Sequence, residues 1–283
     1  MGGTDCISKY FKHIIMSNFS VKKEKLFVIK IGGNVIDESS KLDSFLKRFS
    51  EIKEKKILVH GGGKIATAIG EKLGITSKYI DGRRITDDET IDLVTMVYGG
   101  LVNKQIVAKL QFHKCNAIGI TGADANLLPA KKRPVKEIDY GWVGDVNEID
   151  SYNWRLFLEN HLTPIAAPLT HDCNGQILNT NADTIASVIA VALSSFYETN
   201  LVFCFEKNGV LEDVNDETSI ISKLTLNDYL SLKKSDKLFA GILPKIDNAF
   251  DAISKGVKEV TIGNSSQLSS LINGTGGTKI SLQ

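Results

Sequence analysis

The nine residues Leu26–Asn34, LFVIKIGGN, join an apolar run to a lysine and then to two adjacent glycines. The apolar run is typical of a buried strand. Glycines at its end let the backbone approach a ligand, and free N–H groups at a turn or helix start favour an anion. Lys30 adds a compact positive charge. The stretch therefore predicts a buried strand that leads into an anion-binding turn.

A second strand and glycine turn follow at Ile57–Lys64, ILVHGGGK, and here the turn runs into a helical pattern. Neither turn has the glycine spacing of the P-loop or of the dinucleotide-binding fingerprint. A tight connection between a strand and a helix would explain either turn alone. Two such turns in succession, one of them with a lysine in its strand, favour a phosphate-handling enzyme.

The composition excludes several other classes of protein. The chain has 283 residues, enough for one large domain or two modest lobes, with 42% apolar and 24% charged residues. The net charge of +1 gives no indication of a nucleic-acid-binding protein. No apolar run is long enough to span a membrane. The four cysteines are widely spaced and predict no zinc site. We expect a cytoplasmic protein whose residues 1–25 form an N-terminal extension without a signal peptide.

Strand and helix patterns alternate along the rest of the chain, which predicts a mostly parallel sheet with helices on both faces. Such sheets bind ligands at the carboxyl ends of their strands, where both glycine turns lie. A loop-like segment at His171–Gln176 divides the chain into lobes 26–176 and 177–283, and Asp124–Glu148 is expected to leave the sheet as a hairpin. The predicted strands are Leu26–Ile31, Ile57–His60, Ala117–Thr121, Thr163–Pro168, Asn200–Phe205 and Glu259–Ile262, and the predicted helices are Leu42–Ile52, Ile65–Leu73, Glu89–Phe112, Ala182–Ser195, Lys245–Ser254 and Gln267–Ile272.

Two polar motifs begin predicted helices of the second lobe. Asn179, Asn181 and Asp183 alternate just before an apolar helix, although a helix cap needs only one such side chain. A carboxylate at this position could orient lysines. Lys245 follows Pro244 at the start of another helix, where a cation is electrostatically unfavourable unless an anion binds there.

A third motif, Gly82-Arg-Arg-Ile-Thr86, lies in the first lobe. Thr86 and Glu89 have the spacing of a capping box, so we expect the helix to start at Thr86. Arg84, just before this start, could grip a substrate carboxylate with its planar fork. A solvated pair of arginines is the alternative. His60, beside the glycine triplet, is interpreted as a structural residue.

Taken in order, these motifs resemble those of the amino acid kinase family over Phe27–Ile280. The resemblance implies a three-layer α/β/α sandwich with an N-acyl-glutamate site in the first lobe, an ATP site in the second, and a homodimer. The matching motifs are Lys30-x-Gly32-Gly33, His60-Gly61-Gly62-Gly63, Gly82-x-Arg84-x-Thr86, Met96–Asn103 with Gly99 and Gly100, Asn179-x-Asn181-Ala-Asp183 and Gly241-x-x-x-Lys245.

Within this family, the chain is most similar to the kinases that phosphorylate the γ-carboxylate of N-acetyl-L-glutamate with MgATP, a step toward arginine. The reacting carboxylate is already ionised, so catalysis needs positioning and charge stabilisation rather than a base. Mg²⁺ would be held mainly by the ATP phosphates, with no metal site of the protein. The resemblance implies catalytic roles for Lys30, Lys245 and Asp183, phosphate binding by Gly32, Gly33 and Gly62, substrate binding by Gly62, Gly63, Arg84 and Asn179, and nucleotide binding by Glu206, Lys207, Asn208, Gly209 and Lys237–Phe239.

Several alternatives remain open. The acyl group could be succinyl instead of acetyl, with Arg83 as a candidate for the extra cation. A carbamate or uridylate kinase of the same family, a non-catalytic sensor and a dinucleotide-dependent oxidoreductase are further alternatives. Ile262–Leu271 lacks the His and Glu signature of the arginine-inhibited members, so weak or absent inhibition by arginine is expected.

Overall fold

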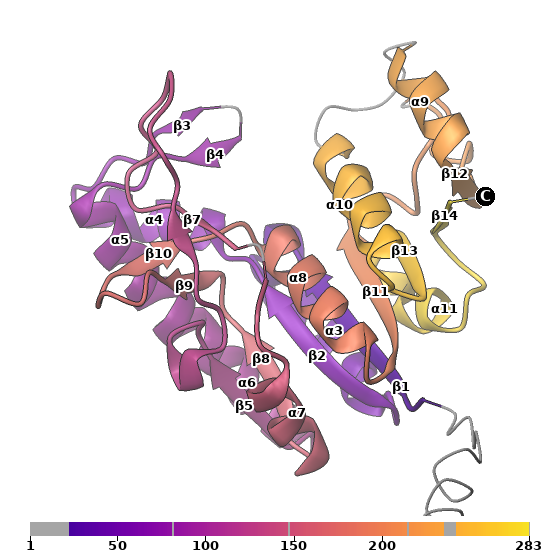
Figure 1. Ribbon diagram of the computed structural model, residues 1–283, viewed down its shortest axis with the longest axis horizontal. Coiled ribbons are helices and arrows are strands. Elements are labelled where there is room, and N and C mark those ends of the chain that lie inside the picture. Colours follow the sequence, from indigo (N-terminus) through magenta and orange to yellow (C-terminus); the bar gives the residue numbers. More distant parts are fainter. Residues whose placement is uncertain (1–22, 81, 147, 214, 235–241, 283) are drawn as a thin grey trace, which may run out of the picture.

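The computed structural model describes residues 23–80, 82–146, 148–213, 215–234 and 242–282. Within them, one eight-stranded sheet crosses the molecule (Figure 1), in the order β12-β14-β13-β11-β1-β2-β8-β5. Its strands are β1 (Lys25–Ile31), β2 (Lys55–His60), β5 (Ala117–Ile120), β8 (Thr163–Ala166), β11 (Glu198–Phe205), β12 (Lys223–Thr225), β13 (Glu259–Asn264) and β14 (Thr278–Ser281). Among these pairs, only β13 with β14 is antiparallel. The predicted mostly parallel sheet is confirmed.

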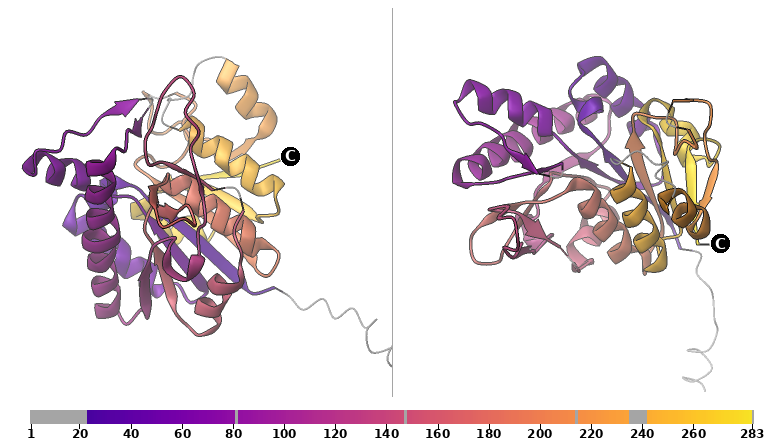
Figure 2. Two further views of the ribbon diagram at one scale, coloured as in Figure 1. Left: turned by 60° about the vertical axis from the view of Figure 1, so that its left-hand side comes forward. Right: turned by 90° about the horizontal axis from the view of Figure 1, so that it is seen from above.

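Helices cover both faces of this sheet (Figure 2), as the alternating pattern predicted. Three of them, α7 (Tyr152–Glu159), α8 (Ala182–Ser194) and α10 (Leu243–Ser254), pack on one face. The other face carries α3 (Ser39–Glu51), α4 (Gly63–Lys72), α5 (Asp88–Val94), α6 (Asn103–Phe112) and α11 (Leu268–Ile272). The short helix α2 (Gly33–Ile36) precedes α3, and α9 (Leu226–Lys234) follows β12. Two apolar clusters, one on each face, form the core, which makes the fold a three-layer α/β/α sandwich.

The central strand β1 links the two predicted lobes. It pairs with β2 of the first lobe on one side and with β11 of the second on the other, in parallel register. Its residues from Leu26 to Ile31 are buried, because both faces of a parallel sheet are covered by helices. The carboxyl end of β1 therefore lies in the middle of the molecule. The assignment of one substrate to each lobe stays a prediction.

The helix predicted over Glu89–Phe112 consists of three parts. Between α5 and α6, Thr95–Val102 form a π-helix, η1, which the apolar pattern did not reveal. The cap lies one residue later than the predicted Thr86, since the side chain of Asp87 accepts a hydrogen bond from the backbone N–H of Thr90 and α5 begins at Asp88. The hydroxyl of Thr86 does not cap the helix but accepts a hydrogen bond from the side-chain amide of Asn179. A carboxylate one residue on provided the cap that the threonine was expected to supply.

Three small antiparallel hairpins stand outside the sheet, on the side of the first lobe. They are β3 (Tyr79–Ile80) with β4 (Arg83–Arg84), β6 (Lys131–Lys132) with β7 (Gly144–Asp145), and β9 (Leu169–His171) with β10 (Ile177–Asn179). The second of these confirms the hairpin predicted within Asp124–Glu148. Two 3₁₀ turns, η2 (Asp124–Asn126) and η3 (Ser265–Gln267), complete the described elements.

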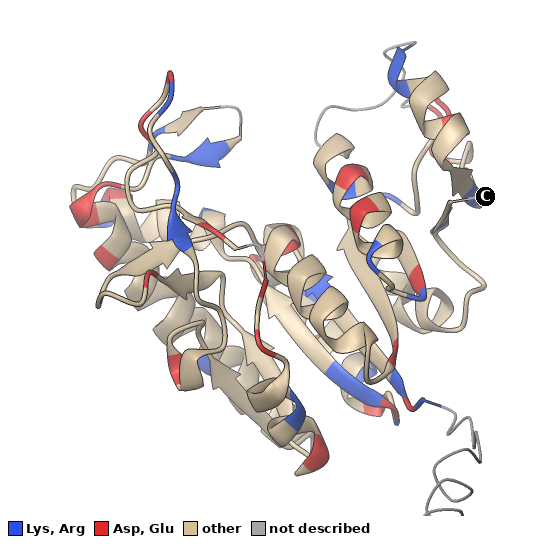
Figure 3. Ribbon diagram, viewed as in Figure 1, with Lys and Arg blue, Asp and Glu red and all other residues tan. Residues whose placement is uncertain are grey.

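Charged residues are distributed over both halves of the molecule, with blue and red segments of the ribbon intermingled (Figure 3), in line with the net charge of +1. In the part of the chain that the structure describes, no helix is both long and apolar enough to cross a membrane.

Candidate active site

Asp183 joins two lysines that lie 215 positions apart in the chain. Lys30 arrives on β1, Lys245 on the first turn of α10, and Asp183 on the first turn of α8. One carboxylate oxygen of Asp183 lies 2.8 Å from Nζ of Lys30, and the other lies 2.8 Å from Nζ of Lys245. The sequence predicted these three residues as a catalytic set, and the structure brings them together.

Burial decides how this triad behaves electrostatically. The side chains of Lys30, Asp183 and Lys245 are only 10%, 8% and 15% exposed. Burial alone would raise the pKa of Asp183, but the charges and hydrogen bonds of Lys30 and Lys245 outweigh it and lower the pKa to about 2. The triad therefore holds two cations against one anion at neutral pH, and its excess positive charge favours an incoming anion.

The two glycine turns lie against each other beside this triad. The N–H of Gly61 donates to the carbonyl of Ile31 at 3.0 Å, and a Cβ on Gly61 would lie 3.8 Å from the backbone nitrogen of Gly33. Gly33 is the first residue of α2, and Gly62 directly precedes α4. Both turns thus present helix-starting backbone at the same sheet edge, where N–H groups without helical partners can bind phosphate oxygens.

The ring of Tyr98, in η1, packs against the second glycine turn at Gly62. Gly62 has φ of +155°, and a Cβ there would come within 3.0 Å of the Tyr98 ring. His60 stabilises the same region, since Asn103 donates to both its Nε2 and the carbonyl of Ile165. Burial lowers the pKa of His60 to about 4, so the imidazole is neutral at pH 7 and serves structure, as interpreted from the sequence.

A cleft of about 740 Å³ opens at this edge of the sheet. It contains four of the residues predicted to handle phosphate, Lys30, Gly32, Gly33 and Lys245, together with Glu206 of the predicted nucleotide turn. The sequence did not indicate the other wall of the cleft. That wall consists of Asn34, Val35, Ser40, Lys41, Ser44, Arg48, Cys204, Phe205, Asn264, Ser265 and Ser266.

Two of the remaining predicted nucleotide residues, Lys207 and Gly209, lie against other parts of the protein. Lys207 pairs with Glu217, and a Cβ on Gly209 would lie 2.7 Å from both Ile220 and Thr278. The turn is thus braced against the 217–220 segment and β14, with Glu206 at the cleft. Lys237–Phe239, also expected to face ATP, lie outside the described residues.

Arg84 and Asn179 lie on the side of the first lobe. The buried guanidinium of Arg84 donates to the carbonyl of Gly63 at 2.8 Å and to the hydroxyls of Thr67 and Ser77. All three acceptors are neutral, and Arg84 has no carboxylate partner among the described residues. A buried cation of this kind is suited to a ligand carboxylate. Arg83, in contrast, is exposed.

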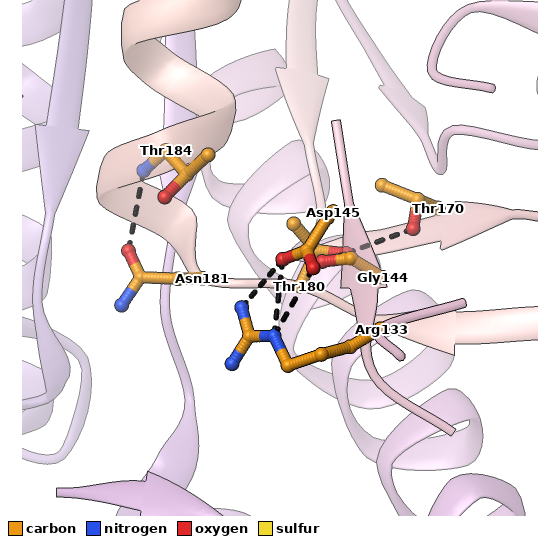
Figure 4. Close-up of polar contacts among 7 residues, drawn as sticks. All are labelled: Arg133, Gly144, Asp145, Thr170, Thr180, Asn181 and Thr184. Carbon is orange, nitrogen blue, oxygen red and sulfur yellow. Dashed lines mark hydrogen bonds and ion pairs between the residues drawn. The ribbon is translucent and has the colours of Figure 1, made fainter. Parts of the chain in front are cut away.

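Arg133, a hairpin cation for which the sequence motifs gave no signal, lies beside this region. Arg133 donates from Nε and Nη2 to Asp145, at 3.1 and 2.6 Å, while its Nη1 is buried without a hydrogen-bond partner. Figure 4 shows its guanidinium between Asp145 and Asn181, the residue that caps α8 through the N–H of Thr184. Arg133 is the third of three consecutive basic residues, and the sequence could not show that it differs from its exposed neighbours Lys131 and Lys132 by turning inward.

The sequence also matches known proteins. A family model described as "Amino acid kinase family" matches residues 25–264. The acetylglutamate kinase of Cytophaga hutchinsonii is 54% identical over 260 residues, which cover 91% of this chain and 98% of that protein. The chain belongs to the amino acid kinase family.

Two further comparisons agree with this membership. The acetylglutamate kinase of Bacteroides fragilis is 50% identical over 258 residues, covering 91% of this chain and 97% of that protein. The crystal structure of smu.665 from Streptococcus mutans superimposes with a TM-score of 0.75 at 29% identity, covering 91% of this chain and 99% of the other. The resemblance stated from the motifs is confirmed, and the chain is a kinase.

No group of three or more His, Cys, Asp or Glu side chains in the described part of the chain could hold a metal ion. Asp183 is engaged by both lysines.

Proposed function

We propose that the chain transfers the γ-phosphoryl group of MgATP to the γ-carboxylate of N-acetyl-L-glutamate, giving an acyl phosphate used in arginine biosynthesis. The observation that carries this proposal is the Lys30–Asp183–Lys245 triad, with both Nζ–carboxylate distances at 2.8 Å, beside two adjoining glycine turns. The relatives named acetylglutamate kinase support the acceptor.

The reaction needs two anions to approach each other. One oxygen of the substrate γ-carboxylate forms a bond to the γ-phosphorus, the bond from that phosphorus to the bridging oxygen breaks, and ADP leaves with the electron pair. No proton moves, so no general base is required. Lys30 and Lys245 neutralise charge on the transferring group, and N–H groups at Gly33 and Gly62 bind its oxygens. Mg²⁺ bound to the nucleotide would supply further charge neutralisation.

Asp183 is a positioning residue in this scheme. Without it, two cations would repel each other in a partly buried site. Because its carboxylate stays ionised, it fixes both ammonium groups in place before the substrates arrive. Such preorganisation is what makes electrostatic stabilisation effective during the reaction.

Residues on the first-lobe side of the site would orient the acyl-glutamate substrate. Arg84 would bind the α-carboxylate of the glutamate, with Gly63 at its guanidinium and Asn179 held by Thr86 nearby. The γ-carboxylate would then extend toward the triad. A homodimer is the proposed assembly.

An ATP-dependent hydroxamate assay tests the proposed reaction, since hydroxylamine traps an acyl phosphate as it forms. We expect signal with N-acetyl-L-glutamate and Mg²⁺, and none with free L-glutamate or carbamate as acceptor. Phosphorylation of UMP gives no acyl phosphate, so UMP is tested by the release of ADP instead, and none is expected. Signal with carbamate, or release of ADP with UMP, in place of signal with N-acetyl-L-glutamate would assign the site to another reaction of the same family.

Arg133 favours a second acceptor, N-succinyl-L-glutamate. In this orientation Arg84 binds the α-carboxylate and the triad lies at the γ-carboxylate, so the acyl group on the α-nitrogen points toward the hairpin. The backbone of Trp142 in this hairpin hydrogen-bonds to the backbone of Thr86 and of Asn179. Arg133 is ion-paired with Asp145 through Nε and Nη2, and its buried Nη1 is left to donate to an acyl chain that ends in a carboxylate. The exposed Arg83 does not occupy such a position.

Comparing the two acyl glutamates in the same assay tests this second acceptor. Arg133→Met is expected to lower kcat/KM for the succinyl substrate about tenfold and to leave the acetyl substrate within about threefold. Lys131→Met, an exposed change on the same hairpin, is the matched control. Equal effects on both substrates would assign Arg133 a purely structural role.

A further inference from the structure

One arm of the cleft extends along α3, beyond the residues that the proposed reaction uses. Ser40, Ser44 and Arg48 follow each other at four-residue intervals and therefore share one face of the helix. All three line the cleft, and Ser265 and Ser266 line it as well. We call this part of the cleft the α3 arm. The opposite face of the helix packs in the core through Leu42, Phe45, Leu46 and Phe49.

Arg48 is a cation without a partner in the α3 arm. Its side chain is partly buried, and its Nε–H is shielded from water without an acceptor. None of the described residues forms an ion pair with its guanidinium. Lys41, which lines the same cleft, shows the contrast, because it lies 2.6 Å from Glu38 and is largely exposed. A partly buried charge left without a partner is unfavourable unless a ligand supplies one.

The direction of the helix aims Arg48 along the arm. Side chains on a helix lean toward its N-terminus, and the N-terminal end of α3 packs against α2, which begins at Gly33. The rise from Ser40 to Arg48 is about 12 Å at about 1.5 Å a residue. The arm is therefore longer than a single phosphate group bound at Gly33.

The charges of the cleft point to an anionic ligand in this arm. Its lining contains the cations Lys30, Lys41, Arg48 and Lys245 and one carboxylate, that of Glu206. Serine hydroxyls and the planar guanidinium fork together match the oxygens of a phosphate group.

We propose that Arg48 binds a phosphate group in the α3 arm, distinct from the phosphoryl group that is transferred at Lys30. Two sources share this chemistry: a non-transferred phosphate of the bound nucleotide, and a free phosphate ion. Only the first source depends on the proposed kinase reaction. In either case Arg48 contributes binding, not chemistry.

Titration calorimetry of the full chain tests this proposal without relying on turnover. The probes are Mg²⁺ with the non-hydrolysable nucleotide AMP-PNP, and inorganic phosphate. In the Arg48→Met variant, the apolar stem remains and the guanidinium is lost. We expect Kd to rise about tenfold for AMP-PNP if the phosphate belongs to the nucleotide, or for inorganic phosphate if it is free. Lys47→Met, an exposed change at the neighbouring position, should leave both values within twofold.

Two results would overturn the assignment of Arg48: equal Kd values for both probes in wild type and in Arg48→Met, or the same weakening in Lys47→Met. The melting temperature of each variant shows whether it is folded, and Arg48→Gln replaces Arg48→Met if the methionine variant is not. A wild-type chain that binds AMP-PNP but makes no acyl phosphate would refute the proposed function and leave the role of Arg48 standing.

Discussion

Asp183 is the single side chain on which the geometry of the triad depends, because its two oxygens hold Lys30 and Lys245 at equal distances of 2.8 Å. Its pKa of about 2 lies below the ordinary value of 3.8. A carboxyl whose pKa is depressed by folding stabilises the folded state above its unfolded pKa. That stabilisation is lost as the pH falls from about 4 toward 2.

We therefore predict a pH-dependent difference between wild type and Asp183→Asn. Near pH 6 the substitution should lower the free energy of unfolding by about 2 kcal/mol or more, because two partly buried lysines lose their counterion. The difference should shrink as the pH falls below 4. Denaturant unfolding at several pH values measures it, and a difference that stays constant down to pH 3 would show that the depressed pKa is not the cause.

Lys30 and Lys245 should each be indispensable for turnover, since both neutralise the transferring group. We predict that Lys30→Met and Lys245→Met each lower kcat at least 100-fold in the hydroxamate assay while the far-ultraviolet circular dichroism remains that of wild type. Lys64→Met offers a matched control, since Lys64 is an exposed lysine close to the second glycine turn. Near-normal turnover in both Lys30→Met and Lys245→Met would contradict the proposed role of the two lysines in charge neutralisation.

The elements around the second glycine turn show why one glycine is required and its neighbour is not. Gly62 has φ of +155° and the Tyr98 ring of η1 beneath it, whereas a Cβ on Gly63 would meet no atom within 4 Å. We predict that Gly62→Ala lowers the free energy of unfolding by about 1–3 kcal/mol through backbone strain and the ring contact. Gly63→Ala, the control, should change it by less than about 0.5 kcal/mol. If a urea titration gave the same free energy of unfolding for Gly62→Ala and Gly63→Ala, the π-helix would not be the support of this turn.

Sequence reasoning located the buried elements well because their signals are local. The strand predicted at Ile57–His60 and the helix predicted at Ala182–Ser195 both appear, within about two residues at each end. It missed α7 and the π-helical character of η1. A π-helix differs from an α-helix in which backbone groups pair, and an apolar run carries no mark of that difference.

Only the site residues that belong to a sequence motif could be predicted. The ordered motifs identified Lys30, Asp183 and Lys245, which converge from three separate elements. Arg48 and Arg133 were missed, because each is set apart by a property of the folded chain, a buried nitrogen without a hydrogen-bond partner. Ser40, Ser44 and Arg48 at four-residue spacing were visible in the sequence. Such a stripe is typical of any solvated helix face and gave no reason to single it out.

At the level of the whole molecule, we expect two chains to associate. Met96, Leu101 and Phe112 follow each other along η1 and α6 with exposed fractions of 57%, 41% and 79%. Exposed apolar side chains along adjoining elements favour an interface. We predict a particle of about 62 kDa, twice the 31.0 kDa of the chain, by light scattering after gel filtration.

Leu101→Glu should convert this particle to the single chain, because a carboxylate would be buried in the contact. Leu230→Glu, an equally exposed leucine on α9, is the control and should leave the mass unchanged. A wild-type chain that elutes at about 31 kDa at micromolar concentration would contradict the dimer.

The most direct test of the proposed reaction is to follow the oxygen that attacks phosphorus. N-acetyl-L-glutamate labelled with ¹⁸O in its γ-carboxylate is incubated with MgATP and the protein, and hydroxylamine then cleaves the product at its acyl carbon. If the carboxylate attacks the γ-phosphorus, the phosphate released must carry one ¹⁸O atom, which mass spectrometry detects. Phosphate without ¹⁸O would mean that water is the acceptor, and the account of the Lys30–Asp183–Lys245 site as a carboxylate kinase would be wrong.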